Sequence, residues 1–251
     1  MDITPDRLAV IADIHGNADA LTAVLADIDA LGNAEIVNLG DHLSSPLAAA
    51  ETAEILLSRP MTCIRGNHDR YLIEHLPAEM HRTDATAYRQ LQPRHIDWLE
   101  TLPPVAEMGE VLLCHATPQD DETYFLEEVR PDGALIRRPH KGIAELAGSS
   151  AHKVILCAHT HLPRAVRLTD GRLIVNPGSV GVPGYTDDTP YPHAVEAGTP
   201  DANYAILERK GDSWRVNFRL VPYDPSRMSE MARREGRDDW AAMLETGWIK
   251  T

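Results

Sequence analysis

The sequence is short of basic residues, and this shortage excludes several classes of partner. Its 251 residues contain 24 Lys and Arg against 38 Asp and Glu, a formal net charge of −14. A surface this acidic repels nucleic-acid backbones and anionic membranes, so we expect neither a nucleic-acid polymer nor a membrane as a partner. An anionic small substrate would also be repelled, unless a positive group such as a metal ion lies where it binds.

Cysteines are few and long apolar runs are absent. Cys63, Cys114 and Cys157 lie in apolar stretches without CxxC spacing, which indicates buried thiols in a reducing compartment and no disulfide framework. No stretch approaches the roughly 18 apolar residues that a membrane-spanning helix needs. The opening "MDITPDR" is too short and too acidic for a signal peptide. We therefore expect a cytoplasmic protein, and the sequence leaves open whether it forms homo-oligomers.

The first half of the chain alternates short apolar runs with helical patterns. We expect strands over 7–12, 35–39 and 61–65, and helices over 18–32 and 45–57. Gly32 is a stop signal for the first helix, whereas Ser45 as N-cap and Pro46 at the first helical position open the second. This βαβαβ order predicts a layered α/β domain with right-handed crossovers.

The second half changes from crossover connections to hairpins. Hairpins are expected over 105–115, 165–176 and 204–221, with turns at Gly109, Asp170-Gly171 and Gly211, and another buried strand over 153–159. Helical patterns cover about 70–102 and 225–246. We predict one domain over 1–251, with 225–251 as a C-terminal helical extension. The sequence does not decide whether this extension packs on its own domain or on a second subunit.

Polar residues follow five separate apolar strands. They are Asp13 and His15, Asp41 and His42, Asn67, His68 and Asp69, His115, and finally His159 and His161. Ligands of open α/β sheets bind at the carboxyl ends of strands, so these turns predict one shared metal site. A single histidine after a strand is ordinarily structural, and the fivefold repetition is what favours ligands. The alternative of a structural or rim residue is preferred for His42. Histidines without this position are interpreted as surface or structural residues: His75, His81, His95, His140, His152 and His193.

The chemistry of these side chains limits the choice of metal. Carboxylate, amide oxygen and imidazole without thiolate suit Mn, Fe, Zn or Co better than Mg or Ca. Asn67 is neutral, so it would add no negative charge to a site that must attract phosphate. A carboxylate that bridges two ions holds them about 3.5–4 Å apart, the separation used for in-line displacement at phosphorus.

The motifs "DIH" (13–15), "GD" (40–41), "GNHD" (66–69), "CHA" (114–116) and "AHTH" (158–161) resemble, in this order, those of the calcineurin-like metallophosphoesterase superfamily. The resemblance covers roughly residues 8–182. "NPGSVGVP" (176–183) further resembles the compact bacterial phosphodiesterase-type branch, where this Gly-rich turn lies close to the site. The implied fold is α/β, a four-layer αββα sandwich of two mainly mixed β-sheets flanked by helices.

The resemblance also implies a role for each motif residue. Asp41 would bridge two divalent ions. The remaining ligands would be Asp13, His15 and His161 for one ion, and Asn67, His115 and His159 for the other. His68 would face the substrate and protonate the leaving group, and Asp69 would orient His68. One departure is Ala158 in place of the family's Gly, which weakens the second site if that position needs a positive φ.

The implied activity is binuclear metal-dependent phosphoesterase, with in-line attack by a metal-bridging hydroxide. A small phosphorylated substrate is expected, and a phosphodiester or dinucleoside polyphosphate is favoured over a phosphomonoester or phosphoprotein. The rival from another class is a non-catalytic protein-binding scaffold on the same fold. The sequence lacks GxGxxG, a Walker lysine loop and a GxSxG elbow, so dinucleotide, P-loop and serine-hydrolase functions find no support.

Basic residues are candidates for substrate binding because the chain has so few. Arg65 precedes the "GNHD" turn and could contact phosphate. "IRRPHKG" (136–142) places Arg137 and Arg138 on a segment tied at both ends to expected ligands. We hypothesise that these two arginines overhang the cleft and bind a second phosphate or a nucleotide, with a solvated loop as the alternative.

Overall fold

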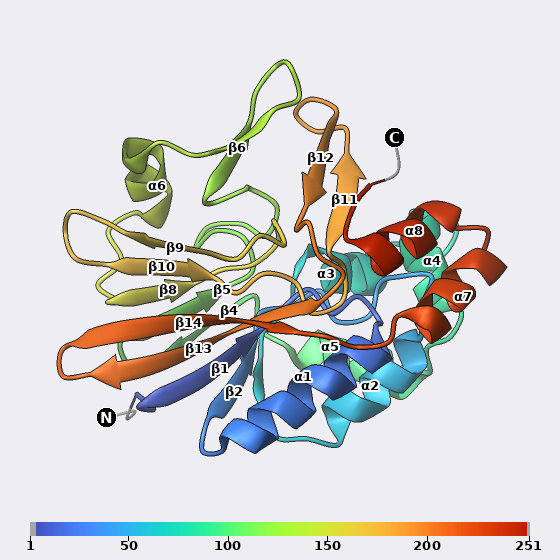
Figure 1. Ribbon diagram of the computed structural model, residues 1–251, viewed down its shortest axis with the longest axis horizontal. Helices are drawn as coiled ribbons and strands as arrows, with labels where there is room; N and C mark the ends of the chain where they lie inside the picture. Colours follow the sequence, from blue (N-terminus) through green and yellow to red (C-terminus); the bar gives the residue numbers. More distant parts are fainter. Residues whose placement is uncertain (1–3, 250–251) are drawn as a thin grey trace.

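Two five-stranded β-sheets lie face to face in the computed structural model, which describes residues 4–249 (Figure 1). The first has the order β14 (Ser213–Val221), β13 (Ala202–Lys210), β1 (Arg7–Ile11), β2 (Glu35–Asn38), β3 (Thr62–Cys63). The second has the order β4 (Val105–Met108), β5 (Val111–Cys114), β8 (Val154–Leu156), β10 (Leu173–Asn176), β9 (Arg164–Arg167). In both sheets three neighbouring strands are parallel and the others antiparallel, so both are mixed as predicted.

Alternating side chains divide each strand between two apolar layers. Leu8 and Val10 of β1 pack between the sheets against residues of β5, β8 and β10, whereas Ala9 and Ile11 face the helices on the outer side. The second sheet repeats this division, because Leu113 of β5 faces the inter-sheet layer and Leu112 faces outward. Successive side chains of a strand point to opposite faces, and both faces of these strands are covered. The runs are therefore apolar at every position.

Helices cover the outer face of each sheet. Those on the first sheet are α1 (Ala18–Leu31), α2 (Ala49–Leu57), α3 (Asn67–Glu74), α4 (Arg82–Tyr88) and α5 (Pro93–Thr101). The second sheet is covered by α6 (His140–Ala147), through Ile143 and Ala147. The four layers of the predicted αββα sandwich are therefore present. No helix within residues 4–249 has the length and apolarity to cross a membrane.

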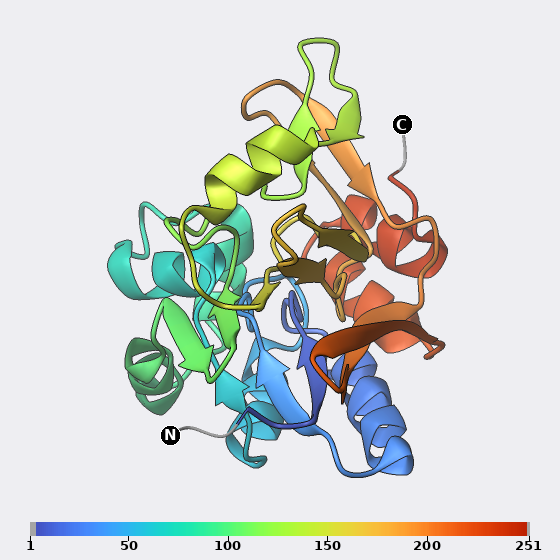
Figure 2. The ribbon, with the colours of Figure 1, turned by 90° about the vertical axis from the view of Figure 1, so that its left-hand side faces the viewer.

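Two smaller hairpins extend from the sandwich. They are β6 (Glu127–Val129) with β7 (Leu135–Arg137), and β11 (Gly184–Asp187) with β12 (His193–Glu196). The two hairpins lie side by side in both views (Figures 1 and 2). The three hairpins predicted within the sheets are confirmed, each with a glycine of positive φ in its turn: Gly109, Gly171 and Gly211.

The helices differ from the prediction in two regions. The second helix begins at Ala49, because the N–H of Ala48 donates to Gly16 and the Ser45 hydroxyl binds the N–H of Leu47 instead of capping a helix. Residues 70–102, predicted to be helical, are divided among α3, α4 and α5. Pro77 disfavours helical backbone at the residue before it, and Pro93 opens α5.

The C-terminal segment is two helices that pack on their own chain. Gly236, with φ of 66°, separates α7 (Ser226–Arg234) from α8 (Asp238–Thr246), so one continuous helix over 225–246 is wrong. The pair buries Met228 and Leu244 against Leu47 and Ala48, directly before α2. All three cysteines are free. Cys114 and Cys157 are buried, whereas Cys63 is partly exposed.

Candidate metal centre

The predicted ligands converge although they come from both sheets. Asp13 follows β1, Asp41 follows β2 and Asn67 follows β3, whereas His115 and the pair His159 and His161 follow β5 and β8 of the second sheet. The carboxyl ends of these parallel strands meet at one edge of the sandwich, which is the convergence expected from the sequence.

Six of the seven predicted ligands form two clusters. One contains Asp13, His15 and His161, the other Asp41, His115 and His159, and within each the candidate ligand atoms lie within 4.8 Å of one another. Asp41 lies between the clusters, because its Oδ2 is 3.6 Å from Nε2 of His15 and 3.4 Å from Nε2 of His115. The seventh, Asn67, places Oδ1 3.1 Å from the same His115 nitrogen.

Backbone carbonyls fix the tautomers of the four histidines. Nδ1–H of His15, His115 and His161 can donate to the carbonyls of Ser44, Leu39 and Val182 at 2.8–2.9 Å, which leaves Nε2 free. His159 is reversed, since its Nε2 contacts the Glu122 carbonyl at 2.8 Å and Nδ1 is left for the site. A hydrogen bond on the second ring nitrogen is the usual support for a metal-binding imidazole.

Unpartnered buried atoms test whether these residues fit a cation. Both carboxylate oxygens of Asp13 and Nε2 of His15 are buried without a hydrogen-bond partner. Burial raises the pKa of Asp13 to about 8 and lowers the pKa values of His15, His159 and His161, whereas the carboxylate of Asp41 raises the pKa of His115 against the effect of burial. Burying polar atoms without a hydrogen-bond partner costs folding free energy, and a divalent cation would give a partner to the Asp13 oxygens and to Nε2 of His15. The residues fit a metal.

The family model of the calcineurin-like phosphoesterase superfamily domain matches residues 7–196. The chain belongs to this superfamily. It is accordingly a metal-dependent phosphoesterase, with two candidate metal-binding clusters.

Three proteins are similar to this chain over nearly its whole length. An uncharacterised protein of Methanocaldococcus jannaschii is 25% identical over 248 residues, covering 93% of this chain and 94% of the relative. A metallophosphoesterase from Sphaerobacter thermophilus is 26% identical with a TM-score of 0.75, covering 96% of this chain and all of the other. A hypothetical protein from Pyrococcus horikoshii shares the fold at 20% identity, with a TM-score of 0.74 and coverage of 97% and 99%.

Backbone strain is concentrated on the predicted ligands of this phosphoesterase. Within residues 4–249, six non-glycine residues have positive φ, and five of them are predicted ligands: Asp13, His15, Asp41, His159 and His161. Each such conformation costs on the order of 1–3 kcal/mol and persists where the surrounding structure holds it. The backbone of Gly66 lies close to the Asp41 carboxylate. A Cβ at this position would overlap the carboxylate, so the site requires glycine here.

Ala158 does not need the conformation that a glycine would provide. It is absent from the residues with positive φ, and that conformation falls instead on His159. The Ala158 N–H donates to the His115 carbonyl at 2.6 Å, and its carbonyl accepts from the Asn176 amide at 2.8 Å. Its methyl group packs in the inter-sheet layer. The departure from the family motif is therefore compatible with the second cluster.

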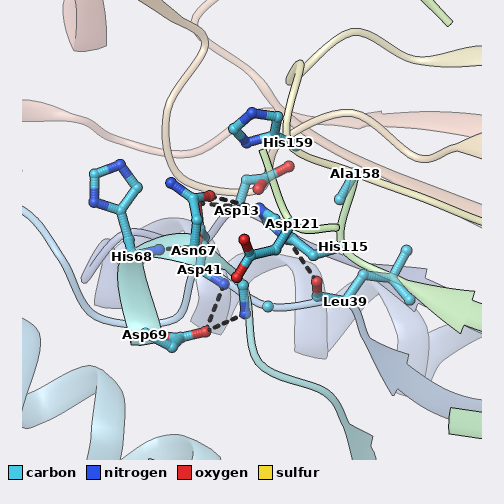
Figure 3. Close-up of polar contacts among 12 residues, drawn as sticks. Asp13, Leu39, Asp41, Asn67, His68, Asp69, His115, Asp121, Ala158 and His159 are labelled. Atoms are coloured by element: carbon cyan, nitrogen blue, oxygen red, sulfur yellow. Dashed lines mark hydrogen bonds and ion pairs between the residues drawn. The ribbon is translucent and has the colours of Figure 1, made fainter. Parts of the chain in front are cut away.

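The prediction that Asp69 orients His68 is wrong. Asp69 accepts hydrogen bonds from the N–H groups of Asp41, His42 and Gly66, and its Oδ2 lies 2.7 Å from the His42 ring. His68 and Asp69 extend to different sides of their turn (Figure 3). Asp69 and His42 thus form a buried pair that holds the turns of the predicted ligands Asp41 and Asn67, which agrees with the structural interpretation of His42.

Asp84 on α4 is the partner of His68, a contact that no pattern in the sequence indicates. Oδ1 of Asp84 lies 2.8 Å from Nδ1 of His68, and the Ser44 hydroxyl contacts the same oxygen. Burial opposes protonation of His68, but the carboxylates of Asp41 and Asp84 raise its pKa to about 9 in the metal-free protein. The side chain of His68 is partly exposed and faces a pocket.

The pocket has a volume of about 580 Å³ and opens over the two clusters. Its floor includes His15, Asp41, Asn67, His159 and His161, with His68 at the side. The Gly-rich turn lies close to the site as predicted, because Val182 lines the pocket and Ser179 donates to the Asp13 carbonyl at 2.7 Å. His81, interpreted from the sequence as a surface or structural residue, is exposed and also lines the pocket.

The three arginines predicted to bind substrate do not line this pocket. Arg138 donates to the Tyr124 carbonyl at 2.9 Å and pairs with Glu128 at 3.6 Å. Arg137 is exposed at the end of β7, and Arg65 follows β3 with its N–H bound to the Pro103 carbonyl. Arg137 and Arg138 are not among the residues that line the cleft, which differs from the hypothesis that they overhang it.

Proposed function

We propose that this phosphoesterase hydrolyses phosphodiesters at a binuclear centre formed by the two clusters. The observation that carries the proposal is the position of Asp41 between them, within 3.6 Å of one histidine from each. Mn, Fe, Zn and Co are the ions that suit this set of carboxylate, amide and imidazole ligands. When bound, two such ions supply an activated water and positive charge for the phosphoryl oxygens.

His68 is proposed as the general acid. Its Nδ1 is held by Asp84, so Nε2 is the nitrogen available to a leaving group in the pocket. A proton donated from Nε2 neutralises the alkoxide that forms as the ester bond breaks, which matters most for poor leaving groups. Asp84 is a positioning residue in this scheme, since its carboxylate acts through the imidazole.

Charge supports a diester over the other predicted substrates. A phosphodiester has one negative charge, whereas a phosphomonoester has close to two at neutral pH. The chain has a net charge of −14, and the outer pocket contains Asp187, Asp188 and Asp239 against Arg237. Each further negative charge on the substrate is opposed by this field. The prediction of a dinucleoside polyphosphate substrate depended on Arg137 and Arg138 binding a second phosphate. These arginines do not line the pocket, so they give that substrate no support. We propose a small phosphorylated molecule as the partner, without a membrane or a nucleic-acid polymer.

A metal-reconstituted comparison of two esters tests the proposal. The protein is stripped with a chelator, loaded in turn with Mn, Fe, Zn or Co, and assayed on bis(4-nitrophenyl) phosphate and 4-nitrophenyl phosphate. We expect a kcat/KM for the diester at least about tenfold higher, a difference of about 1.4 kcal/mol in transition-state binding. Elemental analysis should give two ions per chain. A preference for the monoester, or one ion at full activity, would contradict the proposal.

A further inference from the structure

We infer that the C-terminal helices and β11 form a specificity wall, which binds one ester substituent of the substrate as an organic group that is uncharged or cationic. We use the term specificity wall for Asp187, Asp188, Arg237, Trp240 and Met243. The inference rests on the proposed function, because the reacting phosphate must lie at the metal clusters for a substituent to reach this wall.

The wall is continuous with the metal centre. Trp240 and Met243 of α8 line the same pocket as His15 and His161. The ring centroid of Trp240 lies 6.5 Å from that of His15, and Nε2 of His15 is the buried, unpartnered atom that points to a bound cation. A phosphate held at the first cluster therefore has an aromatic surface within the length of one substituent.

The apolar side of the wall suits a carbon-rich group. Trp240, Met243, Val182 and Ile249 line the pocket beyond the histidines. Trp240 is only half-buried, so part of its indole remains available to a ligand. Aromatic side chains bind ring systems through large contact areas and bind cations through the ring face.

The charge of Arg237 is already compensated. Its guanidinium binds Asp239 through Nε and Nη2 at 2.6–2.9 Å, donates to the Thr83 hydroxyl at 3.1 Å, and lies 5.4 Å from the centre of the Trp240 ring. These contacts hold Arg237 as a support for Trp240, not as a free phosphate-binding group. The outer pocket thus lacks an uncompensated cation among its lining residues.

Two carboxylates at the rim have no cationic partner within residues 4–249. Asp187 accepts the N–H of Thr189 at 2.8 Å, and Asp188 makes no side-chain hydrogen bond or ion pair with residues 4–249. Both are exposed at the end of β11. A second anion on the substrate would meet these charges, whereas an amine or another cation would be attracted and a neutral group tolerated.

The wall is fixed to the rest of the chain and lies largely outside the family match. The match ends at residue 196, before α7 and α8. Arg227 binds Asp19 and Glu51 at the start of α1 and α2, and Arg89, directly after α4, pairs with Glu235 at 3.1 Å. A rigid element added beside a shared metal centre is a means of selecting substrates without changing the chemistry.

Three aryl methyl phosphodiesters test the charge preference. They differ only at the para position, which is aminomethyl, hydroxymethyl or carboxymethyl, so the methylene keeps the leaving phenols similar. Hydrolysis of the esters is measured by product release. Calorimetry on the manganese-loaded protein measures binding of the matching aryl methylphosphonates, in which phosphorus bears a methyl group. We expect the cationic ester to exceed the anionic one at least about tenfold in kcat/KM, with the same order in binding.

Variants assign the preference to the wall. Asp187→Asn with Asp188→Asn, which keeps the acceptor for Thr189, should reduce the cation-to-anion ratio to about twofold or less. The matched control Asp212→Asn with Glu100→Gln also removes two exposed acids, neither of which lines the pocket, and should leave the ratio unchanged. Trp240→Ala should raise KM for all three esters about tenfold, whereas Trp248→Ala, at an exposed tryptophan outside the pocket, should not.

Failure of this inference differs from failure of the proposed function. Hydrolysis of all three esters with equal kcat/KM and equal binding would overturn the wall and leave the phosphodiesterase intact. A second outcome is that none of the esters is hydrolysed, while the phosphonates still bind in the expected order of charge and lose this order in the Asp187 and Asp188 variant. This outcome would overturn the phosphodiesterase and support the wall. A charge order unaffected by that variant would also overturn the wall.

Discussion

The Asp84 carboxylate of α4 lies 2.8 Å from Nδ1 of His68 on α3, so a separate helix holds the proposed acid in place. Two adjacent residues of one turn, His68 and Asp69, are thereby assigned to different partners. Asp69 holds the backbone of the Asp41 turn, whereas Asp84 holds the imidazole. The two carboxylates should consequently fail in different ways when they are changed.

Asp84→Asn should lower turnover and leave the metals bound. We expect kcat for a diester to fall about 10- to 100-fold, part of the 10²–10⁴-fold that a general acid contributes. The loss should nearly vanish in a His68→Asn background, because the two residues act as a unit. Elemental analysis and kcat of the single and double variants are the measurements. Full additivity of the two losses would count against the positioning role.

Asp69→Asn is the contrasting change. It weakens bonds to three backbone N–H groups and to the buried His42 ring, so we expect a loss of stability of about 2–4 kcal/mol and a lower metal content. Urea denaturation of the metal-free variant and elemental analysis measure both. Unchanged stability with lost turnover would instead return Asp69 to the role that the sequence suggested.

Asp41→Asn should remove both ions and abolish activity, because one carboxylate lies between the clusters. The fold should survive, since asparagine keeps an acceptor for the N–H of His68 and the side chain lies outside the apolar layers. Elemental analysis and circular dichroism check the two expectations, with Asp212→Asn in the β13–β14 turn as control. Retention of two ions with normal turnover would rule out a shared position.

The sequence predicted the parts of the site that follow strands. Asp13, Asp41 and His115 come directly after apolar runs, so the position of each along the chain determines its position at the sheet edge. Asp84 and Trp240 belong to helices, whose approach to the site depends on packing against other helices. Nothing in the local pattern of 82–88 or 238–246 distinguishes a side chain that faces the pocket from one that faces another helix.

The erroneous helix predictions have a related cause. Ser45 and Pro46 are an ordinary pattern for the start of a helix. The N–H of Ala48, however, donates to the carbonyl of Gly16, in the turn that carries Asp13 and His15. Long-range hydrogen bonding therefore overrode a local preference beside the metal centre. The prediction that Arg137 and Arg138 bind substrate rested on charge alone. A local excess of positive charge does not show which side of a segment faces a cleft.

Arg70 is predicted to support the second cluster at a distance. Its guanidinium binds Asp121 through two bonds of 2.8 Å and Glu122 through a third, and the Glu122 carbonyl holds Nε2 of His159. Arg70→Ala should weaken retention of one of the two ions about 10- to 100-fold, the usual effect of losing a group that orients a ligand. Metal titration by calorimetry measures this. Arg234→Ala, which removes an exposed pair with Glu230, should leave both affinities unchanged.

Ala158→Gly should lower stability without improving metal binding. The residue lies outside the positive-φ region, so glycine relieves no strain there, while it removes a methyl group buried to 3% exposure between the sheets. The lost methyl and the added chain entropy together cost about 1–2 kcal/mol. Denaturation by urea gives the stability, and calorimetric titration gives both metal affinities. Unchanged affinities are expected because the Ala158 N–H and carbonyl bonds, which hold His115 and the turn before His159, belong to the backbone and survive the substitution. A clear gain in affinity would show that the alanine strains the second cluster despite its ordinary backbone.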